Sequence, residues 1–380
     1  MRQVYLDYNT TTPVAPAVRD AMWPFLGDHY GAPSSGHALG RATQEAVEDA
    51  REQVGALIGA DREEIVFTSG GTESNNLALL GVLTRQSLEV RGHLVLSAIE
   101  HASVAGPARY LQRLGFDLTI VPCDAQGRID PQLVADALRP NTLLVSVMHA
   151  NDEVGAIQPI ADIAELCRAR GILLHSDASQ SLGKARVKVD DLGVDLLTIA
   201  GHKMYAPKGI GALYIRSGVA INPILHGAAH ESGLRPGTEN VPGIMGLGKA
   251  ASLAQKMLDE VLPRTASLRD QLVELLRESI GPALRVHGDL APRLQNTCSV
   301  SFPGVNAAKL LDLAPEVLAW TAMPLHEPAI NPSPTLAAMG VRAEQAAGTV
   351  RFSVGWYTTE DEIEFAANRL LDAWERLQDG

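Results

Sequence analysis

Cysteine is scarce in this chain of 380 residues, which contains only Cys123, Cys167 and Cys298. The three are odd in number, far apart in the sequence and in no CxxC pair. This pattern argues against a disulfide framework and against a zinc site built from thiolates, and it favours a reducing cytoplasm as the compartment. We therefore expect no metal site.

Long apolar runs and an excess of positive charge are also missing. No stretch of 18 or more uninterrupted apolar residues occurs, and the first residues hold no apolar core of signal-peptide length, so we expect neither a membrane span nor secretion. The formal net charge of -12 has the wrong sign for binding a phosphate backbone, and nucleic acid is not an expected partner. Hydrophobic residues make up 46% of the chain, which is ample material for a globular core.

Short apolar runs alternate with segments of helical periodicity along the first two thirds of the chain. The runs predict strands at 64–68, 93–97, 117–121, 142–148, 171–175, 195–199 and 212–215. The segments between them predict helices at 73–85, 103–114, 131–138 and 160–170. Near-continuous apolar strands that alternate with helices are typical of an α/β fold with a mostly parallel sheet covered on both faces.

The pattern changes after about residue 255. An amphipathic helix is expected at 268–280, a strand at 298–302, and a further helix from Thr359, where Glu362 completes a capping box. The predicted organisation is an N-terminal arm at 1–15 that packs with the small domain, a large α/β domain at 16–255 and a small α+β domain at 256–380.

Polar side chains follow three successive predicted strands. TLLVSVM runs into HANDEVG, GILLH runs into SDASQ, and DLLTI runs into AGHKMYAPKG. Because function collects at the carboxyl ends of parallel strands, we expect Asp177, Gln180 and the pair His202 and Lys203 to reach the same edge of the sheet. A glycine-rich turn, TSGGTESNN at 68–76, precedes a helix, and its N–H groups can bind an anion such as phosphate.

A phosphate cradle, an aspartate and a lysine at the ends of different strands are what pyridoxal 5'-phosphate requires. The lysine forms a Schiff base with the aldehyde of this cofactor. The aspartate holds the pyridine nitrogen protonated, so that the ring can accept electrons. The sequence therefore predicts pyridoxal 5'-phosphate as the cofactor, with Lys203 and Asp177 in these two roles.

The chain resembles the cysteine desulfurases of the class-V aminotransferase family, which are fold-type I pyridoxal phosphate enzymes. The resemblance spans nearly the whole chain. Its motifs are YLDYNTTTP (5–13), PSSGH (33–37), TSGGTESNN (68–76), EHASV (100–104), NDEVG (151–155), HSDASQSLGK (175–184), GHKMYAPKGIGALYIR (201–216), GLRPGTEN (233–240) and RFSVG (351–355).

The resemblance implies how individual residues meet the ring of the cofactor. Lys203 carries the Schiff base and Asp177 is the partner of the pyridine nitrogen. His101 stacks on the ring face, and Gln180 hydrogen-bonds the ring oxygen beside the imine. The family's second Asn of an Asn-Asn-Glu triplet is Asp152 here, which puts a carboxylate near the ring oxygen and changes the charge around the cofactor.

The resemblance also implies a phosphate site and a substrate site. Gly71, Thr72 and His202 hold the phosphate, and Thr238 reaches it from the other subunit of a homodimer. Arg351 clamps the carboxylate of an amino-acid substrate, a role that suits the bidentate fork of arginine.

One landmark of the family is missing. Cysteine desulfurases attack the substrate sulfur with a thiolate on a mobile loop, and the matching stretch here puts Leu325, or Pro324 if the gap shifts by one, at the place of that cysteine. No cysteine occurs between 299 and 380. The three cysteines of the chain are interpreted as small apolar fillers of the core. Ala32 and Ala200 also replace the family's usual Asn and Ser.

These features predict an enzyme that keeps the pyridoxal chemistry without the sulfur-abstracting loop. We expect deprotonation at the Cα of an amino acid with Lys203 as the base, followed by β-elimination of the C–S lyase type or another carbanion reaction. His326 in the altered loop is a candidate acid or contact for a polar substrate. Two alternatives stay open: a desulfurase that uses an external thiol as sulfur acceptor, and a non-catalytic, pyridoxal-bound scaffold in a sulfur-transfer complex.

Overall fold

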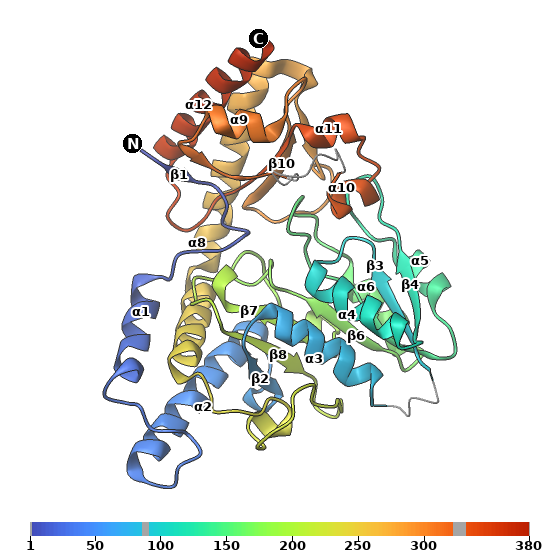
Figure 1. Ribbon diagram of the computed structural model, residues 1–380, viewed down its shortest axis with the longest axis vertical. Coiled ribbons are helices and arrows are strands. Elements are labelled where there is room, and N and C mark those ends of the chain that lie inside the picture. Colours follow the sequence, from blue (N-terminus) through green and yellow to red (C-terminus); the bar gives the residue numbers. More distant parts are fainter. Residues whose placement is uncertain (1, 86–90, 322–331, 380) are drawn as a thin grey trace.

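The computed structural model describes residues 2–85, 91–321 and 332–379. Its chain forms two parts, one above the other in Figure 1, and the long helix α8 (Val241–Ile280) runs from the lower part into the upper one. The lower part is built around a seven-stranded sheet and the upper part around a four-stranded sheet. No helix within the described ranges has an apolar stretch long enough to cross a bilayer.

The seven-stranded sheet has the order β2-β8-β7-β6-β5-β3-β4. Strand β8 is antiparallel to both of its neighbours, and the other adjacent pairs are parallel. The prediction of an α/β fold with a mostly parallel sheet is therefore confirmed. The strands are β2 (Ile65–Thr68), β3 (His93–Ser97), β4 (Asp117–Val121), β5 (Thr142–Ser146), β6 (Leu173–Asp177), β7 (Leu196–Ala200) and β8 (Gly211–Ile215).

The four helices predicted between these strands are present with ends shifted by a few residues. They are α3 (Gly71–Leu83), α4 (Ala102–Arg113), α5 (Pro131–Ala137) and α6 (Ile160–Arg168). The sequence interpretation missed α2 (Ala38–Ile58), which packs against α8. Its buried residues Val47, Ala50, Val54 and Leu57 recur at spacings of three and four, which is the signal that could have found it.

Helix α8 is much longer than the segment 268–280 that the sequence predicted. Leu247 and Ala251 lie in the core of the lower part, whereas Leu268 and Leu272 lie in the core of the upper part. The predicted boundary between residues 255 and 256 consequently falls inside one continuous helix. The apolar residues of this helix contact two different cores, so the sequence alone did not show that they belong to one element.

The upper part contains the four-stranded sheet of order β12-β13-β10-β9 with helices packed on it. The helix predicted from Thr359 is present as α12 (Glu360–Gln378), and its capping box with Glu362 is formed. The other elements of this part are β9 (Arg285–His287), β10 (Thr297–Ser301), α9 (Ala307–Leu313), β11 (Val317–Leu318), β12 (Trp320–Thr321), α10 (Pro334–Ala338), α11 (Ala343–Ala347) and β13 (Thr349–Ser353).

The first residues of the chain lie against this C-terminal part. Strand β1 (Val4–Tyr5) pairs in parallel with β11, and Asp7 forms an isolated bridge with Ser353. The chain then passes down to α1 (Pro16–Met22), so that the residues between them run past the junction of the two parts. The remaining short elements are α7 (Val189–Leu192) and the 3-10 turns η1 (Trp23–Leu26), η2 (Arg62–Glu64), η3 (Gly201–Lys203), η4 (Glu231–Gly233) and η5 (Gly281–Ala283).

Candidate active site

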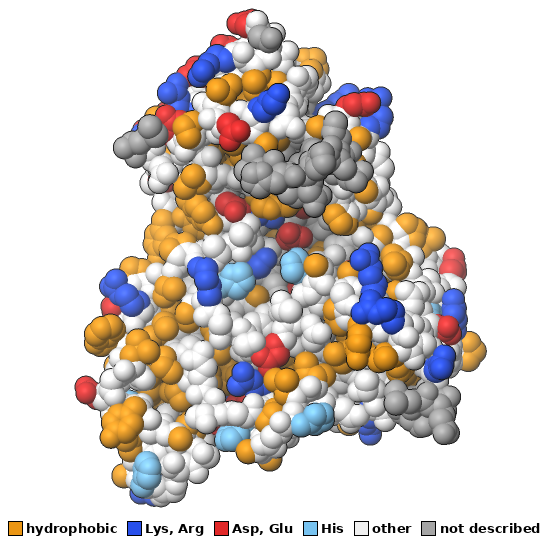
Figure 2. Space-filling model, viewed as in Figure 1, with side chains coloured by type: hydrophobic (Ala, Val, Ile, Leu, Met, Phe, Trp, Pro, Cys, Tyr) orange, Lys and Arg blue, Asp and Glu red, His pale blue; other side chains and the backbone are white. Residues whose placement is uncertain are grey.

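A cavity of about 450 Å³ lies where the two parts meet. Figure 2 shows a hollow at this junction in which acidic, basic and histidine side chains are close together. The structure brings nine of the predicted site residues to its wall: Gly71, Thr72, His101, Asp152, Asp177, Gln180, His202, Lys203 and Arg351.

Two predicted site residues are not among them. Thr238 is exposed in this single chain and is absent from the wall of the cavity, so its assignment to a neighbouring subunit stays a prediction. His326 lies outside the described residues, as do Leu325 and Pro324.

The glycine-rich turn at the start of α3 forms an anion cradle. Gly70 has a φ of +146°, a conformation that favours glycine, and it has no side chain to cap the helix. A Cβ atom at Gly71 would come within 3.0 Å of Ser179 Oγ and 3.2 Å of Ala200 Cβ. The absence of that atom leaves the first N–H groups of α3 open to a bound anion, which fits a phosphate.

Asp177 ends strand β6 and is held by two donors. Its Oδ2 accepts a hydrogen bond of 2.7 Å from Asn75 Nδ2, and its Oδ1 accepts one of 2.9 Å from the backbone N–H of Ser179. The side chain is 6% exposed. Buried and doubly hydrogen-bonded, this carboxylate has a fixed orientation beside the cavity, as the partner of a cationic ring nitrogen needs.

His101 is connected to Asp177 through residues to which the sequence assigned no role. Ser103 Oγ lies 2.7 Å from His101 Nδ1 and accepts a 2.8 Å hydrogen bond from Asn75 Nδ2, which also reaches Asp177. The backbone N–H of Ser103 also donates to His101 Nδ1 at 3.1 Å, so Ser103 contacts this ring nitrogen through both its side chain and its backbone. Asn75 and Ser103 stand in two of the quoted motifs, but spacing alone did not pair them.

Lys203 closes the turn η3 directly after β7. Burial lowers its pKa, while Asp152 and Asp177 oppose that shift. Burial also lowers the pKa of His202 to about 4, and the charge of Lys203 acts in the same direction. A lysine with a lowered pKa has a larger neutral fraction at neutral pH, which is the form that attacks a carbonyl and accepts a proton.

Gln180 takes part in a buried network with the N-terminal arm. Its Nε2 donates to the carbonyl of Asn9 at 3.0 Å, and its Oε1 accepts from Lys184 Nζ at 2.9 Å. Lys184 Nζ also donates to Asn9 Oδ1 at 3.0 Å, and burial lowers the pKa of this lysine well below its ordinary value. The sequence interpretation missed Lys184 and Asn9, because nothing local to either predicts that residues 175 positions apart meet.

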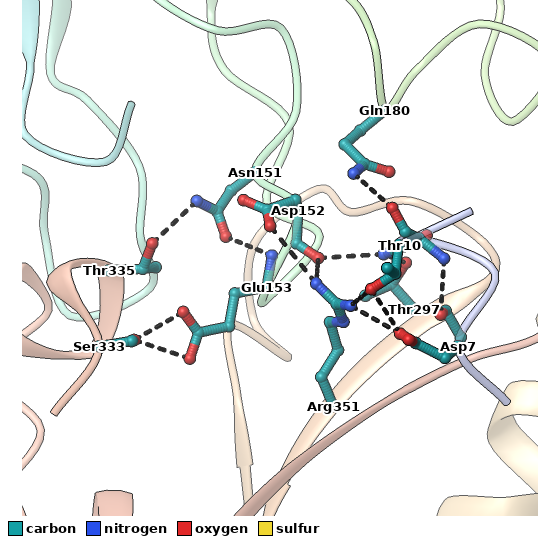
Figure 3. Close-up of polar contacts among 12 residues, drawn as sticks. Asp7, Thr10, Asn151, Asp152, Glu153, Gln180, Thr297, Ser333, Thr335 and Arg351 are labelled. Atoms are coloured by element: carbon teal, nitrogen blue, oxygen red, sulfur yellow. Dashed lines mark hydrogen bonds and ion pairs between the residues drawn. The ribbon is translucent and has the colours of Figure 1, made fainter. Parts of the chain in front are cut away.

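Arg351, from β13, is the cation at the other end of the cavity. Figure 3 shows it between two carboxylates, with Nη2 2.7 Å from Asp7 Oδ1 and Nη1 3.4 Å from Asp152 Oδ2. The guanidinium also lies over the ring of Trp320, 4.5 Å from its centroid. The side chain of Arg351 is only 2% exposed, so little of its surface is open to a substrate.

The loop 151–153 also holds helix α10. Ser333 Oγ, which caps that helix, lies 2.8 Å and 2.6 Å from the two carboxylate oxygens of Glu153 (Figure 3). Asn151 Nδ2 donates to Thr335 Oγ1 at 3.2 Å. Burial raises the pKa of Glu153 to about 7, partly offset by the hydrogen bond from Ser333.

None of the three cysteines contributes to the wall of the cavity. Cys167 lies in α6 and Cys298 in β10, both 1% exposed, and burial raises the pKa of each thiol to about 12. Cys123 is half-buried beside a different surface hollow, and burial raises its pKa too. Thiols with raised pKa values are poor nucleophiles, in keeping with their interpretation as core fillers.

Comparison with known protein families shows to which family this chain belongs. The family model "Aminotransferase class-V" matches residues 4–365. The chain belongs to the class-V aminotransferase family. Members of this family, the cysteine desulfurases among them, depend on pyridoxal phosphate.

Relatives within the class-V aminotransferases carry the name cysteine desulfurase. The chain is 43% identical to cysteine desulfurase IscS of Dictyoglomus turgidum over 379 residues, covering 99% of this chain and 94% of the relative. It is 40% identical to cysteine desulfurase IscS 1 of Archaeoglobus fulgidus over 377 residues, covering 98% and 97%. Desulfurase ancestry is therefore shown, and these relatives support no departure toward a lyase reaction.

Solved structures show the same fold. A NifS-like protein superposes with a TM-score of 0.91 at 35% identity, covering 97% of this chain and 98% of that one. DndA from Streptomyces lividans superposes with a TM-score of 0.78 at 37% identity, covering 92% and 99%. The fold-type I architecture expected from the sequence is confirmed.

Proposed function

We propose that this class-V aminotransferase homologue binds pyridoxal 5'-phosphate in the cavity and acts on an amino acid through a Cα carbanion. Gly71, Thr72 and His202 would hold the phosphate, and Lys203 would bond the aldehyde carbon. In the same arrangement Asp177 would accept the ring N–H. The open start of α3 and the two donors that orient Asp177 support this assignment.

His101 and Gln180 complete the proposed cofactor contacts. His101 lines the cavity with Nδ1 engaged by Ser103, and Gln180 keeps one amide N–H that Asn9 does not use. Thr238 is proposed to reach the phosphate from the second subunit of a homodimer, which accounts for its exposure in a single chain.

Once bound, this cofactor withdraws electrons from the Cα–H bond of an attached amine. Lys203 is the proposed base that takes the Cα proton, because its pKa is lowered by burial and it is the lysine at the wall of the cavity. Arg351 is proposed to orient the substrate carboxylate.

We further propose that the reaction ends without a persulfide on the protein. The observation that carries this is the position of the thiols: no cysteine stands between 299 and 380, and Cys123, Cys167 and Cys298 all lie away from the cavity wall. Loss of a group from Cβ then completes the reaction as an elimination. For L-cysteine the balance is cysteine plus water giving pyruvate, ammonia and hydrogen sulfide.

A second candidate is a desulfurase that passes sulfur to an external thiol. The names of the relatives favour it. Its balance is cysteine plus a thiol giving alanine and the persulfide of that thiol, with the external sulfur in the place of a loop cysteine.

Product analysis separates the two. Amino acids with a leaving group at Cβ, such as L-cysteine and S-methyl-L-cysteine, are incubated with the cofactor-loaded protein, with and without added dithiothreitol. Elimination yields pyruvate and ammonia in equal amounts whether or not the thiol is present. Alanine that appears only with the thiol would overturn elimination in favour of the external acceptor. A protein whose cofactor absorbance no amino acid changes would be a scaffold and not an enzyme.

A further inference from the structure

Both Nη atoms of Arg351 already have hydrogen-bond acceptors within the chain. Its Nη2 donates to Asp7 Oδ1 at 2.7 Å and to Thr10 Oγ1 at 2.6 Å. Its Nη1 donates to the carbonyl oxygen of Asp152 at 3.3 Å and to Oδ2 of the same residue at 3.4 Å. These four contacts, drawn in Figure 3, involve both Nη atoms of the guanidinium.

A substrate carboxylate therefore does not meet a free fork. Bidentate binding of a carboxylate needs two parallel N–H groups of one guanidinium. Among the described residues, the Nε–H of Arg351 is buried without a hydrogen-bond partner, but it is a single donor. An incoming carboxylate must consequently displace one of the acceptors that Arg351 already has.

The two carboxylates beside Arg351 differ in how they can respond. Asp152 lines the cavity and its side chain is 28% exposed, whereas Asp7 is absent from the wall and 17% exposed. The Asp152 contact is also the longer one, at 3.4 Å against 2.7 Å. Asp152 is therefore the group that faces a substrate carboxylate and competes with it.

Asp152 is charged at neutral pH. Burial alone raises the pKa of this carboxyl group, but Arg351, Lys203 and His101 together bring it below its ordinary value. A third carboxylate brought to this one guanidinium would meet two negative charges that are already there, and like charges placed side by side weaken binding.

We propose that Asp152 is a specificity-determining residue, which competes with the α-carboxylate of a substrate for Arg351 and so reduces the preference of the cavity for amino acids over primary amines that lack an α-carboxylate. The position carries an asparagine in the desulfurase pattern that this chain resembles, and an asparagine there would add no charge. The proposal deepens the proposed function, on which its cofactor-dependent readout rests.

The test compares an amino acid with the amine that lacks its carboxylate. The cofactor-loaded wild type and Asp152→Asn are titrated with L-alanine and with ethylamine, and each dissociation constant is taken from the absorbance of the bound cofactor. Asp152→Asn should lower the dissociation constant of L-alanine by about 10- to 100-fold and change that of ethylamine by less than about threefold. A change in the cofactor itself alters both ligands alike, so the ratio isolates the carboxylate.

Calorimetry with propionate gives a readout that needs no reaction with the cofactor. Propionate has the carboxylate without the amine, and Asp152→Asn should bind it about tenfold more tightly than the wild type. Asp152→Glu, which restores the charge, should bind it as weakly as the wild type. Asp162→Asn, at an exposed position of α6, controls for net charge and should match the wild type.

The outcomes distinguish this proposal from the proposed function. Equal gains for L-alanine and ethylamine, or unchanged binding of propionate by Asp152→Asn, would overturn the role of Asp152. Absorbance that neither amine changes would instead overturn the proposed function, while the propionate result still decides the role of Asp152. Asparagine has the shape of aspartate, and the backbone carbonyl of residue 152 keeps its bonds to Asn9 and Arg351, so the variant should fold.

Discussion

The two ends of the cavity are built in different ways. The proposed cofactor end is formed by Gly71, Thr72, Asp177 and Lys203. These residues come from the ends of two strands of the seven-stranded sheet and from the start of helix α3. The proposed substrate end is formed by Asp152, Trp320 and Arg351, with Asp7 as a further partner of Arg351. It gathers a loop after β5, two strands of the upper part and the N-terminal arm.

The two ends also differ in the charge of the groups that hold their carboxylates. At the cofactor end, Asp177 is held by the amide of Asn75 and a backbone N–H, and neither neutralises its charge. At the substrate end, the guanidinium of Arg351 already has two carboxylate partners. The residues of the cofactor end belong to one sheet and one helix and can stay together as a unit. At the substrate end, by contrast, a single replacement such as Asp152 alters the binding of ligands that carry a carboxylate.

The largest expected effect comes from the cofactor end. Lys203→Ala should remove the covalent bond to the cofactor and lower turnover by about 10²- to 10⁴-fold, because the proposed base is lost. Borohydride reduction followed by peptide mass spectrometry should find the cofactor on residue 203 of the wild type and nowhere in the variant. Lys208→Ala, an exposed neighbour, is the matched control and should behave as the wild type. Cofactor bonded to another lysine in the wild type would refute the assignment.

A smaller effect is expected at the phosphate cradle. Gly71→Ala places a Cβ 3.0 Å from Ser179 Oγ and should weaken the binding of pyridoxal 5'-phosphate by about tenfold. Pyridoxal, which lacks the phosphate, should bind the variant and the wild type alike. Gly106→Ala in α4, where an added Cβ meets nothing within 4 Å, is the control. Equal weakening of both ligands would show that the cradle does not hold the phosphate.

The last prediction concerns Glu153, which is next to Asp152, and the stability of the fold instead of ligand binding. The pKa of Glu153, raised from 4.5 to about 7, means that its contribution to stability is complete below pH 4.5 and is lost as the pH rises through 7. The loss amounts to at most about 3 kcal/mol. Glu153→Gln should abolish this part of the fall in melting temperature between pH 5 and pH 8. Glu165→Gln, at an exposed position of α6, is the control and should keep the pH dependence of the wild type. If Glu153→Gln also kept that pH dependence, the carboxyl group of Glu153 would be ionised throughout and the prediction would be wrong.

The sequence predicted which residues of the proposed cofactor end lie together, whereas it did not predict the contacts at the substrate end. Asp177 and Lys203 follow apolar strands, and the rule that parallel strands end at one edge brings them together without knowledge of the rest. Asp7 and Arg351 meet across 344 positions, and no local pattern states which distant segments touch. The sequence could therefore propose a substrate ligand for Arg351, but it could not predict that Asp7 and Asp152 of the same chain form ion pairs with this residue.

The same reasoning explains the errors in the fold. Helix α8 serves two cores, so its apolar residues change neighbours along its length, and only the segment from 268 was recognised. The buried Lys184 was missed for a related reason, since its partner Asn9 lies 175 positions away and reaches it only because the arm crosses the junction.

The central claim is that the cofactor end is retained while no thiol of the chain receives sulfur. Intact-protein mass spectrometry under non-reducing conditions, after reaction with L-cysteine, tests it most directly when pyruvate is measured in the same sample. We predict pyruvate in step with sulfide and no added sulfur on Cys123, Cys167 or Cys298. A sulfur adduct on any of the three that forms and is consumed during turnover, with alanine as the product, would contradict the account.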